Sequence, residues 1–300
     1  MILDENSATI EAVQPKDKRA VADQATERQR KTSMKLDEIY NGSSENMTEI
    51  ETGTVDLAVT SPPYNIDIQY GNKTAKGKVL ESKGIKYRDN MKEEDYRRML
   101  ASVFSECKRV LKDTGSIWIN IKNRVVGGVV LPPFWIQDFF DDLYLKNLII
   151  WNFDWGGSTS RRFAPRYEFV FWFVKNKDHY TFNLDDVKVP ALNYRPDRYK
   201  SQWKNPTDVW RISMVSGNFE ERTSHPAQYP EELVERILLA GTNRGDVVLD
   251  PFMGSGTTGA VAKGLNRQYI GIELNEEYCR LAEERIKKVS GDKKIGEGCV

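Results

Sequence analysis

The sequence predicts an α/β protein with a doubly wound, mostly parallel sheet. Apolar stretches of strand length alternate with amphipathic helical stretches along most of the chain, which is typical of a parallel sheet covered by helices on both faces. In addition, two loops of unusual composition directly follow two of the predicted strands. Loops beyond the carboxyl ends of strands are where open α/β sheets bind ligands.

The first half of the domain begins with an apolar strand at Val55–Thr60. Glu93–Leu111 is predicted to be a helix, because its apolar residues recur at intervals of three and four. Gly115 is expected to end this helix before a buried strand at Ser116–Ile121. The elements that follow are a helix at Phe134–Leu143 and strands at Leu148–Trp151 and Tyr167–Val174.

The second half continues the alternation and ends in a βαβα unit. Pro230 is expected to open a helix whose apolar residues lie on one face. The remaining elements are strand Val247–Leu249, helix Thr257–Lys263, strand Tyr269–Ile272 and helix Glu276–Val289.

Composition sets the domain boundaries. Residues 1–33 lack aromatic side chains and alternate in charge, as in a polar N-terminal arm, and residues 291–300 are predicted to be a frayed tail. Residues 34–175 and 225–290 are the two halves of one α/β domain. Residues 176–224 interrupt the alternation as an insertion, in which cations are interleaved with Tyr194, Tyr199, Trp203 and Trp210.

Interleaved cations and aromatic rings suit contact with phosphates together with bases. The insertion is therefore either a solvated irregular segment or a region that contacts nucleic acid. A second basic patch precedes the strand Tyr167–Val174. The candidate phosphate-contacting cations are Arg161, Arg162, Arg166, Arg195, Arg198, Lys200 and Lys204, with Arg211 also in the insertion.

Composition also excludes several protein classes. No apolar stretch approaches the length of a membrane helix, and no export signal opens the chain. Cys107, Cys279 and Cys299 form no CxxC pair, so neither a disulfide framework nor a metal site is expected, and a reduced cytoplasmic protein is predicted. The formal net charge is zero, so a polyanionic partner requires a local basic surface.

A glycine-rich loop follows Val247–Leu249. It reads Asp250-Pro251-Phe252-Met253-Gly254-Ser255-Gly256-Thr257-Thr258-Gly259, satisfies GxGxxG and opens a helix. Glycine there allows a tight turn and a close approach of the backbone to a ligand. Glu273 ends the next strand, where an acid can accept hydrogen bonds from ribose hydroxyls. Taken alone, this loop is equally consistent with a dinucleotide site.

The other loop reads Thr60-Ser61-Pro62-Pro63-Tyr64-Asn65 and follows Val55–Thr60. The Ser61 hydroxyl and the Pro62 carbonyl can accept hydrogen bonds from an amino group, since the proline pair is stiff and has no N–H. Tyr64 can stack on a planar base.

Together these two loops resemble those of the beta group of DNA amino-methyltransferases, in which the catalytic loop precedes the cofactor loop and a target-recognition region lies between them. The resemblance spans residues 36–289. It implies a Rossmann-like methyltransferase sheet with an inserted target-recognition region, S-adenosyl-L-methionine as the cofactor, and methyl transfer to an exocyclic nitrogen of a base flipped out of double-stranded DNA. It also implies a restriction-modification system with a cognate restriction endonuclease.

The resemblance assigns roles to individual residues. Ser61, Pro62, Pro63 and Tyr64 are the implied catalytic residues. Asp250 is implied to face the methionine amino group of the cofactor. The other implied cofactor-binding residues are Pro251, Phe252, Gly254, Gly256 and Thr257, with Glu273 at the ribose, His225 near the methionine part and Ser43 near the adenine ring.

The target base is predicted from the similarity of two short segments to particular members of the family. Ser-Pro-Pro-Tyr at 61–64 and His-Pro-Ala-Gln-Tyr-Pro at 225–230 are similar to cytosine-N4 members, so N4 of cytosine is predicted and N6 of adenine is the alternative. No cysteine lies in a Pro-Cys context, which disfavours methylation of cytosine C5. A nicotinamide-dependent oxidoreductase and a non-enzymatic DNA-binding protein with the same fold are remoter alternatives. The oligomeric state and recognition sequence do not follow from the sequence.

Overall fold

The computed structural model describes residues 34–66, 89–157, 159–191, 195, 197–198, 201–215 and 219–291. The chain divides into two compact units, Met1–Met34 and Lys35–Val300, and the fold described here is that of the second. The predicted arm at 1–33 and residues 292–300 of the predicted tail lie outside the described residues. So do Tyr194, Tyr199 and Lys200 of the insertion.

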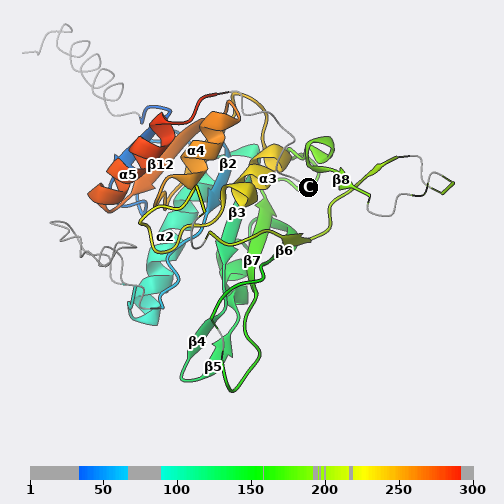
Figure 1. Cartoon of the computed structure of the whole chain (residues 1–300). Helices are drawn as coiled ribbons and strands as arrows, with labels where there is room; N and C mark the ends of the chain where they lie inside the picture. The colour runs from blue at the N-terminus through cyan, green and yellow to red at the C-terminus, as the bar shows by residue number, and fades with distance from the viewer. Residues whose placement is uncertain are drawn as a thin grey trace, which may run out of the picture. The chain divides into compact units, whose positions relative to one another are not determined.

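The centre of the fold is an eight-stranded sheet of order β1-β12-β11-β2-β3-β7-β6-β10 (Figure 1). Strand β7 runs antiparallel to β3 and β6, and every other neighbouring pair is parallel, so the predicted mostly parallel α/β sheet is confirmed. The strands are β1 (Glu38–Asn41), β2 (Val55–Thr60), β3 (Leu111–Ile121), β6 (Tyr144–Asn152), β7 (Tyr167–Val174), β10 (Val209–Arg211), β11 (Val247–Asp250) and β12 (Gln268–Glu273).

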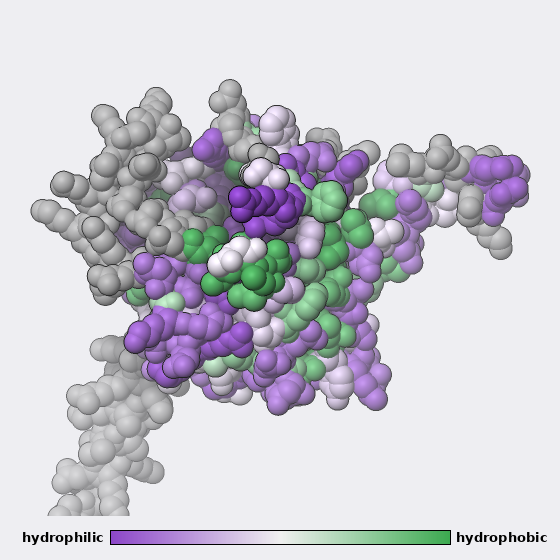
Figure 2. Space-filling view, turned by 90° about the horizontal axis from the view of Figure 1, so that it is seen from below, coloured by the Kyte–Doolittle hydropathy of each residue, from purple (hydrophilic) through white to green (hydrophobic). Residues whose placement is uncertain are grey.

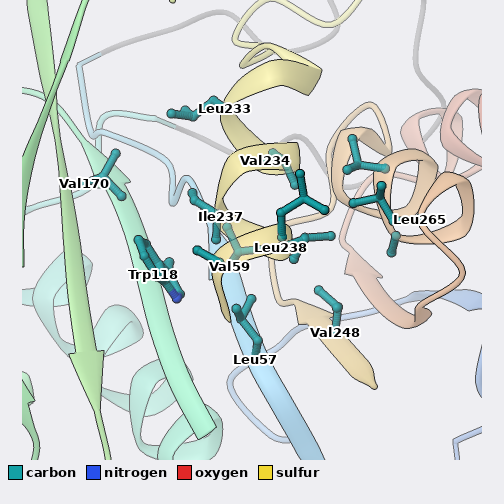
Figure 3. Packing of buried hydrophobic residues seen from close by; sticks show 14 of the residues in the cluster. Leu57, Val59, Trp118, Val170, Leu233, Val234, Ile237, Leu238, Val248 and Leu265 are labelled. Carbon is teal, nitrogen blue, oxygen red and sulfur yellow. The ribbon is translucent and has the colours of Figure 1, made fainter. Parts of the chain in front are cut away.

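Helices cover both faces of the sheet. Helices α3 (Glu231–Gly241), α4 (Thr257–Gly264) and α5 (Glu276–Lys287) share one hydrophobic core with alternate residues of the central strands. Figure 3 shows the α3 side chain of Ile237 near Val59 and Leu57 of β2, which are buried, and Val234 on the side of α3 that faces α4. Helix α2 (Glu93–Val110) and the 3₁₀ helix η1 (Pro133–Phe139) cover the other face. They pack around Phe104, which contacts Phe139 and Phe140.

Two predicted helix boundaries are wrong, for local packing reasons. The α-helix expected at Phe134–Leu143 is the shorter 3₁₀ helix η1, because Phe140 leaves it to stack on Phe173 of β7 at a ring distance of 4.5 Å. Gly115 does not end α2, which stops at Val110. It lies inside β3, where a Cβ would come within 2.8 Å of the Asp56 carbonyl oxygen.

The insertion contributes a strand to the main sheet. Strand β10 pairs with β6, and the Trp210 side chain is only 6% exposed, with its ring stacked 6.4 Å from that of Trp118. Trp210 is therefore a core residue, and its expected place among surface aromatic residues is wrong. The rest of the described insertion holds the 3₁₀ helix η2 (Leu184–Val187) and a separate pair, β8 (Val189–Pro190) with β9 (Trp203–Lys204).

One further hairpin, formed by β4 (Arg124–Val126) and β5 (Val129–Leu131), follows the carboxyl end of β3. The sequence interpretation did not anticipate it. Among the described residues, no helix combines the length and the apolar character that crossing a membrane requires.

Candidate active site between two strand-end loops

A cavity of about 510 Å³ is lined by the segments that follow the parallel strands β1, β2, β11 and β12. Its volume lies within the range of about 300–1,000 Å³ that is usual for small-molecule sites. Both predicted loops line it. The sequence-predicted residues in its wall are Ser43, Ser61, Pro62, Pro63, Tyr64, His225, Pro251, Phe252, Gly254, Thr257 and Glu273.

The hydroxyls of the first loop belong to a hydrogen-bonded chain that ends on a carboxylate. Tyr64 donates its hydroxyl proton to Glu168 Oε2 at 2.9 Å, and Ser61 Oγ lies 2.7 Å from the Tyr64 oxygen. Because Tyr64 has a single hydroxyl proton, Ser61 must be the donor in the contact between the two hydroxyls. The lone pairs of Ser61 Oγ are then left as acceptors, with one long contact from Asn120 Nδ2 at 3.4 Å.

Asn120 of β3 fixes the end of this chain. Its Nδ2 donates to Glu168 Oε2 at 2.7 Å and to the Tyr64 oxygen at 2.9 Å. Asn120 lies on β3 and Glu168 on the neighbouring strand β7, so two neighbouring strands hold the loop that follows a third strand, β2. The loop is thereby held in a single orientation.

The backbone of the first loop is held as firmly. The Pro63 carbonyl accepts from the Tyr96 hydroxyl at 2.8 Å. Buried Asp89 accepts from the backbone N–H of Asn65 at 2.8 Å, and Asn65 adopts a left-handed φ of 55°. Lys122 places its ammonium 5.0 Å from the centroid of the buried Tyr64 ring.

Glu273 is oriented towards the cavity by two backbone groups. Its Oε2 accepts from the Gly254 N–H at 2.9 Å, and its Oε1 accepts from the Asn275 N–H at 2.8 Å. A carboxylate oxygen can accept more than one hydrogen bond, so both keep capacity for a ligand hydroxyl. Burial raises the pKa of Glu273 above its usual value.

Asp250, at the carboxyl end of β11, is enclosed by hydrogen-bond donors of the protein. It is fully buried, and burial raises the pKa of its carboxyl group. Its Oδ1 accepts from the Thr60 hydroxyl and the Phe252 N–H, and its Oδ2 accepts from the hydroxyls of Tyr229 and Thr258, at 2.6–3.0 Å. With these four bonds the carboxylate ties the two loops together, and Asp250 is not among the residues that line the cavity, so its direct contact with a cofactor amino group stays a prediction.

Gly254 and Gly256 of the cofactor loop are required for different structural reasons. Gly254 lines the cavity with φ +53°, and a Cβ on it would come 3.1 Å from His225 Nε2. Gly256 is not part of the cavity wall. Its φ is +79°, and a Cβ would lie 2.6 Å from that of Ala282 in α5. Packing between α4 and α5, rather than approach to a ligand, requires glycine at 256.

His225, Ser43 and Thr257 complete the predicted cofactor wall. Burial lowers the pKa of His225 to about 4, so its ring is neutral near pH 7, and it packs edge-on against Tyr278 at 4.6 Å. Ser43 is exposed, with Oγ 3.3 Å from Glu45. The Thr257 hydroxyl accepts from Arg285 at 2.9 Å.

Sequence reasoning missed Glu168 and Asn120. Both are polar residues inside otherwise apolar strands, Tyr-Glu-Phe-Val-Phe-Trp-Phe-Val for β7 and Ser-Ile-Trp-Ile-Asn-Ile in β3. A buried polar group needs a partner, and this was the available signal. Cavity residues from α2, such as Asp95, Arg98 and Met99, were also missed, since that helix was taken as core alone.

The predicted DNA-binding cations lie in two separate segments. Arg161 and Arg162 are exposed between β6 and β7 and form no ion pair within the part of the chain described, whereas Arg166 is turned onto the carbonyls of Gly157 and Pro165. Arg195 pairs with Asp197 at 2.9 Å, and Arg198 lies 3.9 Å from the same carboxylate. Lys204 is exposed in β9, and Lys200 lies outside the described residues.

Comparison with known proteins finds the N6_N4_Mtase family, described as DNA methylase, over residues 55–284. Type II methyltransferase M.BglII of Bacillus subtilis is 38% identical over 262 residues, which cover 82% of this chain and 68% of that protein. DNA adenine methyltransferase YhdJ of Escherichia coli (strain K12) is 34% identical over 264 residues, 84% of this chain and 83% of that protein.

Among solved structures, PvuII DNA methyltransferase (cytosine-N4-specific) superposes with a TM-score of 0.63. The match covers 88% of this chain and 90% of that one at 21% identity, and it therefore speaks to the fold.

Proposed function

Since the chain belongs to the beta group of S-adenosylmethionine-dependent DNA amino-methyltransferases, we propose that it methylates the exocyclic N4 of cytosine in double-stranded DNA within a type II restriction-modification system. The observation that carries methyl transfer to an exocyclic amine is one cavity walled by both loops, with Ser61 Oγ as an acceptor. The choice of cytosine N4 rests on the similarity of residues 61–64 and 225–230 to cytosine-N4 members. The family match decides against the nicotinamide-dependent oxidoreductase.

The residues that line the cavity suit S-adenosylmethionine. Glu273 would accept hydrogen bonds from the ribose hydroxyls, and Phe252 would pack against the cofactor beside the Tyr278 ring. A neutral His225 does not repel a cationic ligand. Ser43 would lie at the adenine end. When bound, S-adenosylmethionine supplies an electrophilic methyl group on a sulfonium.

The catalytic loop must make an aromatic amine nucleophilic, since its lone pair is delocalised into the ring. Ser61 Oγ would accept one amine proton and favour a more tetrahedral nitrogen. Once the amine carries the methyl group, that proton would pass to Ser61, the Ser61 proton to Tyr64, and the Tyr64 proton to Glu168. The positive charge of the methylated amine is thus neutralised on a carboxylate.

The target base must leave the helix stack to reach this loop. The Tyr64 ring would hold the flipped base, in a position now covered by the Lys122 ammonium. Arg161 and Arg162, and in the insertion Arg195, Arg198 and Lys204, would contact phosphates.

N6 of adenine is the second candidate for the acceptor. The observation in its favour is that YhdJ, at 34% identity over most of both chains, is described as a DNA adenine methyltransferase. The hydrogen-bonded chain of Ser61, Tyr64 and Glu168 could accept a proton from either amine.

Labelled methyl transfer tests the proposal. The protein is incubated with tritiated S-adenosylmethionine and genomic duplex DNA that lacks its own modification, and the DNA is digested to nucleosides. N4-methylcytosine is expected, and Ser61→Ala should yield far less of it. Recovery of N6-methyladenine alone would change the proposed target from cytosine N4 to adenine N6. Absence of any labelled nucleoside would overturn the proposed function.

A further inference from the structure

Hairpin β4–β5 exposes five apolar side chains in succession. Val126 is 58% exposed and Val129 is 62% exposed, and Val125, Val130 and Leu131 are each about 40% exposed. Single exposed apolar residues are ordinary, but a contiguous exposed patch marks a contact surface. Figure 2 shows a hydrophobic group bordered by hydrophilic residues on the face where Figure 1 places this hairpin.

The hairpin is built as a rigid projection. Gly127 and Gly128 both have positive φ, 58° and 83°, as a tight two-residue hairpin turn requires. A two-stranded ribbon is marginally stable alone, and here its base is anchored. Buried Arg124 forms a double ion pair with Glu93 at 2.7 and 2.8 Å and lies over the rings of Tyr96 and Trp135.

The hairpin leaves the sheet beside the catalytic loop. Thr60, which precedes Ser61, is in register with Ile119 of β3, and the hairpin begins just beyond the end of that strand. Lys122, in the connection, contacts the Tyr64 ring. A flipped base that reaches Ser61 from the carboxyl ends of β2 and β3 would bring the rest of the duplex close to the hairpin.

The charges around the hairpin favour a polyanion as the occupant. Residues 122–131 contain no acidic residue, and their one cation that is not buried is Lys122, since Arg124 is buried and paired with Glu93. The segment between β6 and β7, which meets the same sheet edge, adds the exposed cations Arg161 and Arg162 and the exposed ring of Phe163. An apolar ribbon rimmed by cations matches proteins that insert apolar side chains between base steps.

We propose that hairpin β4–β5 is a wedge that enters double-stranded DNA next to the target base, with Val126 and Val129 in contact with the unstacked step. The wedge offsets part of the cost of unstacking and supports the helix after the base has left it. This proposal rests on the proposed DNA methyltransferase function.

The test compares the parent with Val126→Thr/Val129→Thr, which keeps β-branched side chains of the same shape but makes the tip polar. Leu145→Ser is the control, since Leu145 is 40% exposed on β6 at the opposite end of the sheet. The double variant should bind its target duplex about 10-fold more weakly, with unchanged salt dependence and unchanged S-adenosylmethionine affinity.

Two further measurements separate a wedge from other roles. The fluorescence of 2-aminopurine next to the target base should rise on binding of the parent and much less on binding of the double variant. A duplex with a mismatched, already unstacked target should restore most of the lost affinity. Val126→Ile/Val129→Ile should behave as the parent.

Equal affinity and fluorescence for parent and double variant would overturn the wedge while leaving the methyltransferase in place. A parent dimer that becomes a monomer in the double variant, by sedimentation, would make the hairpin an interface between two copies and also overturn it. A parent that methylates no duplex at all would overturn the proposed function itself, and the wedge with it.

Discussion

The catalytic loop and the cofactor loop follow neighbouring parallel strands, yet they are held in different ways. The cofactor loop is part of the core. Asp250 beneath it is fully buried with four hydrogen bonds, and Gly256 packs directly on α5. The catalytic loop instead depends on Glu168 and Asn120, which reach it from other strands. Changes near the first should therefore alter stability or affinity, and changes near the second should alter the rate of chemistry.

Glu168→Gln should produce the largest effect, a loss of about 100-fold in the single-turnover rate of methyl transfer. The amide introduced at position 168 can donate to the Tyr64 oxygen, which would reverse the direction of the hydrogen bonds between Glu168, Tyr64 and Ser61. An amide also cannot accept the proton that Tyr64 would pass to the Glu168 carboxylate. S-adenosylmethionine affinity, measured by calorimetry, should stay as in the parent.

Two controls separate this role from a structural one. Glu168→Asp keeps a carboxylate and should recover part of the rate, and Glu276→Gln, an exposed change on α5, should have no effect. A Glu168→Gln protein with the parental rate and the parental pH profile would show that Glu168 does not position Ser61.

Glu273→Gln should act on the cofactor site and change affinity rather than the rate of chemistry. It removes a charged acceptor for ribose hydroxyls and should weaken S-adenosylmethionine binding about 10- to 30-fold. The single-turnover rate at saturating cofactor should change little. Parental affinity in a folded Glu273→Gln protein would remove Glu273 from the cofactor site.

Gly256→Ala tests whether the cofactor loop is core. The positive φ and the contact with Ala282 should together lower the free energy of unfolding by about 2–3 kcal/mol. Gly53→Ala is the matched control. Gly53 has φ +71° but nothing within 4 Å of a Cβ, so a loss of about 1 kcal/mol is expected. Equal shifts in the urea midpoint of the two variants would mean that packing against α5 contributes nothing.

The two candidate DNA-binding segments can be compared by salt dependence. Arg161→Gln/Arg162→Gln should lower the slope of log affinity against log salt by about 2, since each phosphate contact releases about one counterion. Arg195→Gln/Arg198→Gln should lower it less, because Asp197 already neutralises part of that charge. The reverse ranking would place the main phosphate contacts in the insertion.

The smallest effect is expected from pH, because His225 should not change its charge near neutral pH. Burial lowers the pKa of His225 from 6.5 to about 4, so its ring becomes charged only as the pH falls towards that lower value. His225 should therefore contribute no inflection to S-adenosylmethionine affinity between about pH 8 and pH 5.5. An inflection near pH 6.5 that disappears in His225→Asn would show that the ring titrates normally.

The sequence by itself determined the location of both loops and the order of the longer strands and helices, but not β1, the hairpin β4–β5 or the strands of the insertion. Strands β2 and β7 have the bounds expected from their apolar composition, and the start of α3 follows Pro230 as expected. These features are local, since they depend on periodicity and on turn residues within a short window. Four parallel strands ending at one edge then bring Ser61 and Glu273 to the same cavity.

Only the tertiary structure decided which side chains meet. Asp250 lies beneath the cavity because Thr60 and Tyr229 surround it there, and Trp210 is core because β10 joins β6. Glu168 reaches Tyr64 because β7 runs antiparallel beside β3, a pairing that no local pattern specifies. The physical reason is common to all three: burial and hydrogen-bond partners depend on strand neighbours that are distant along the chain.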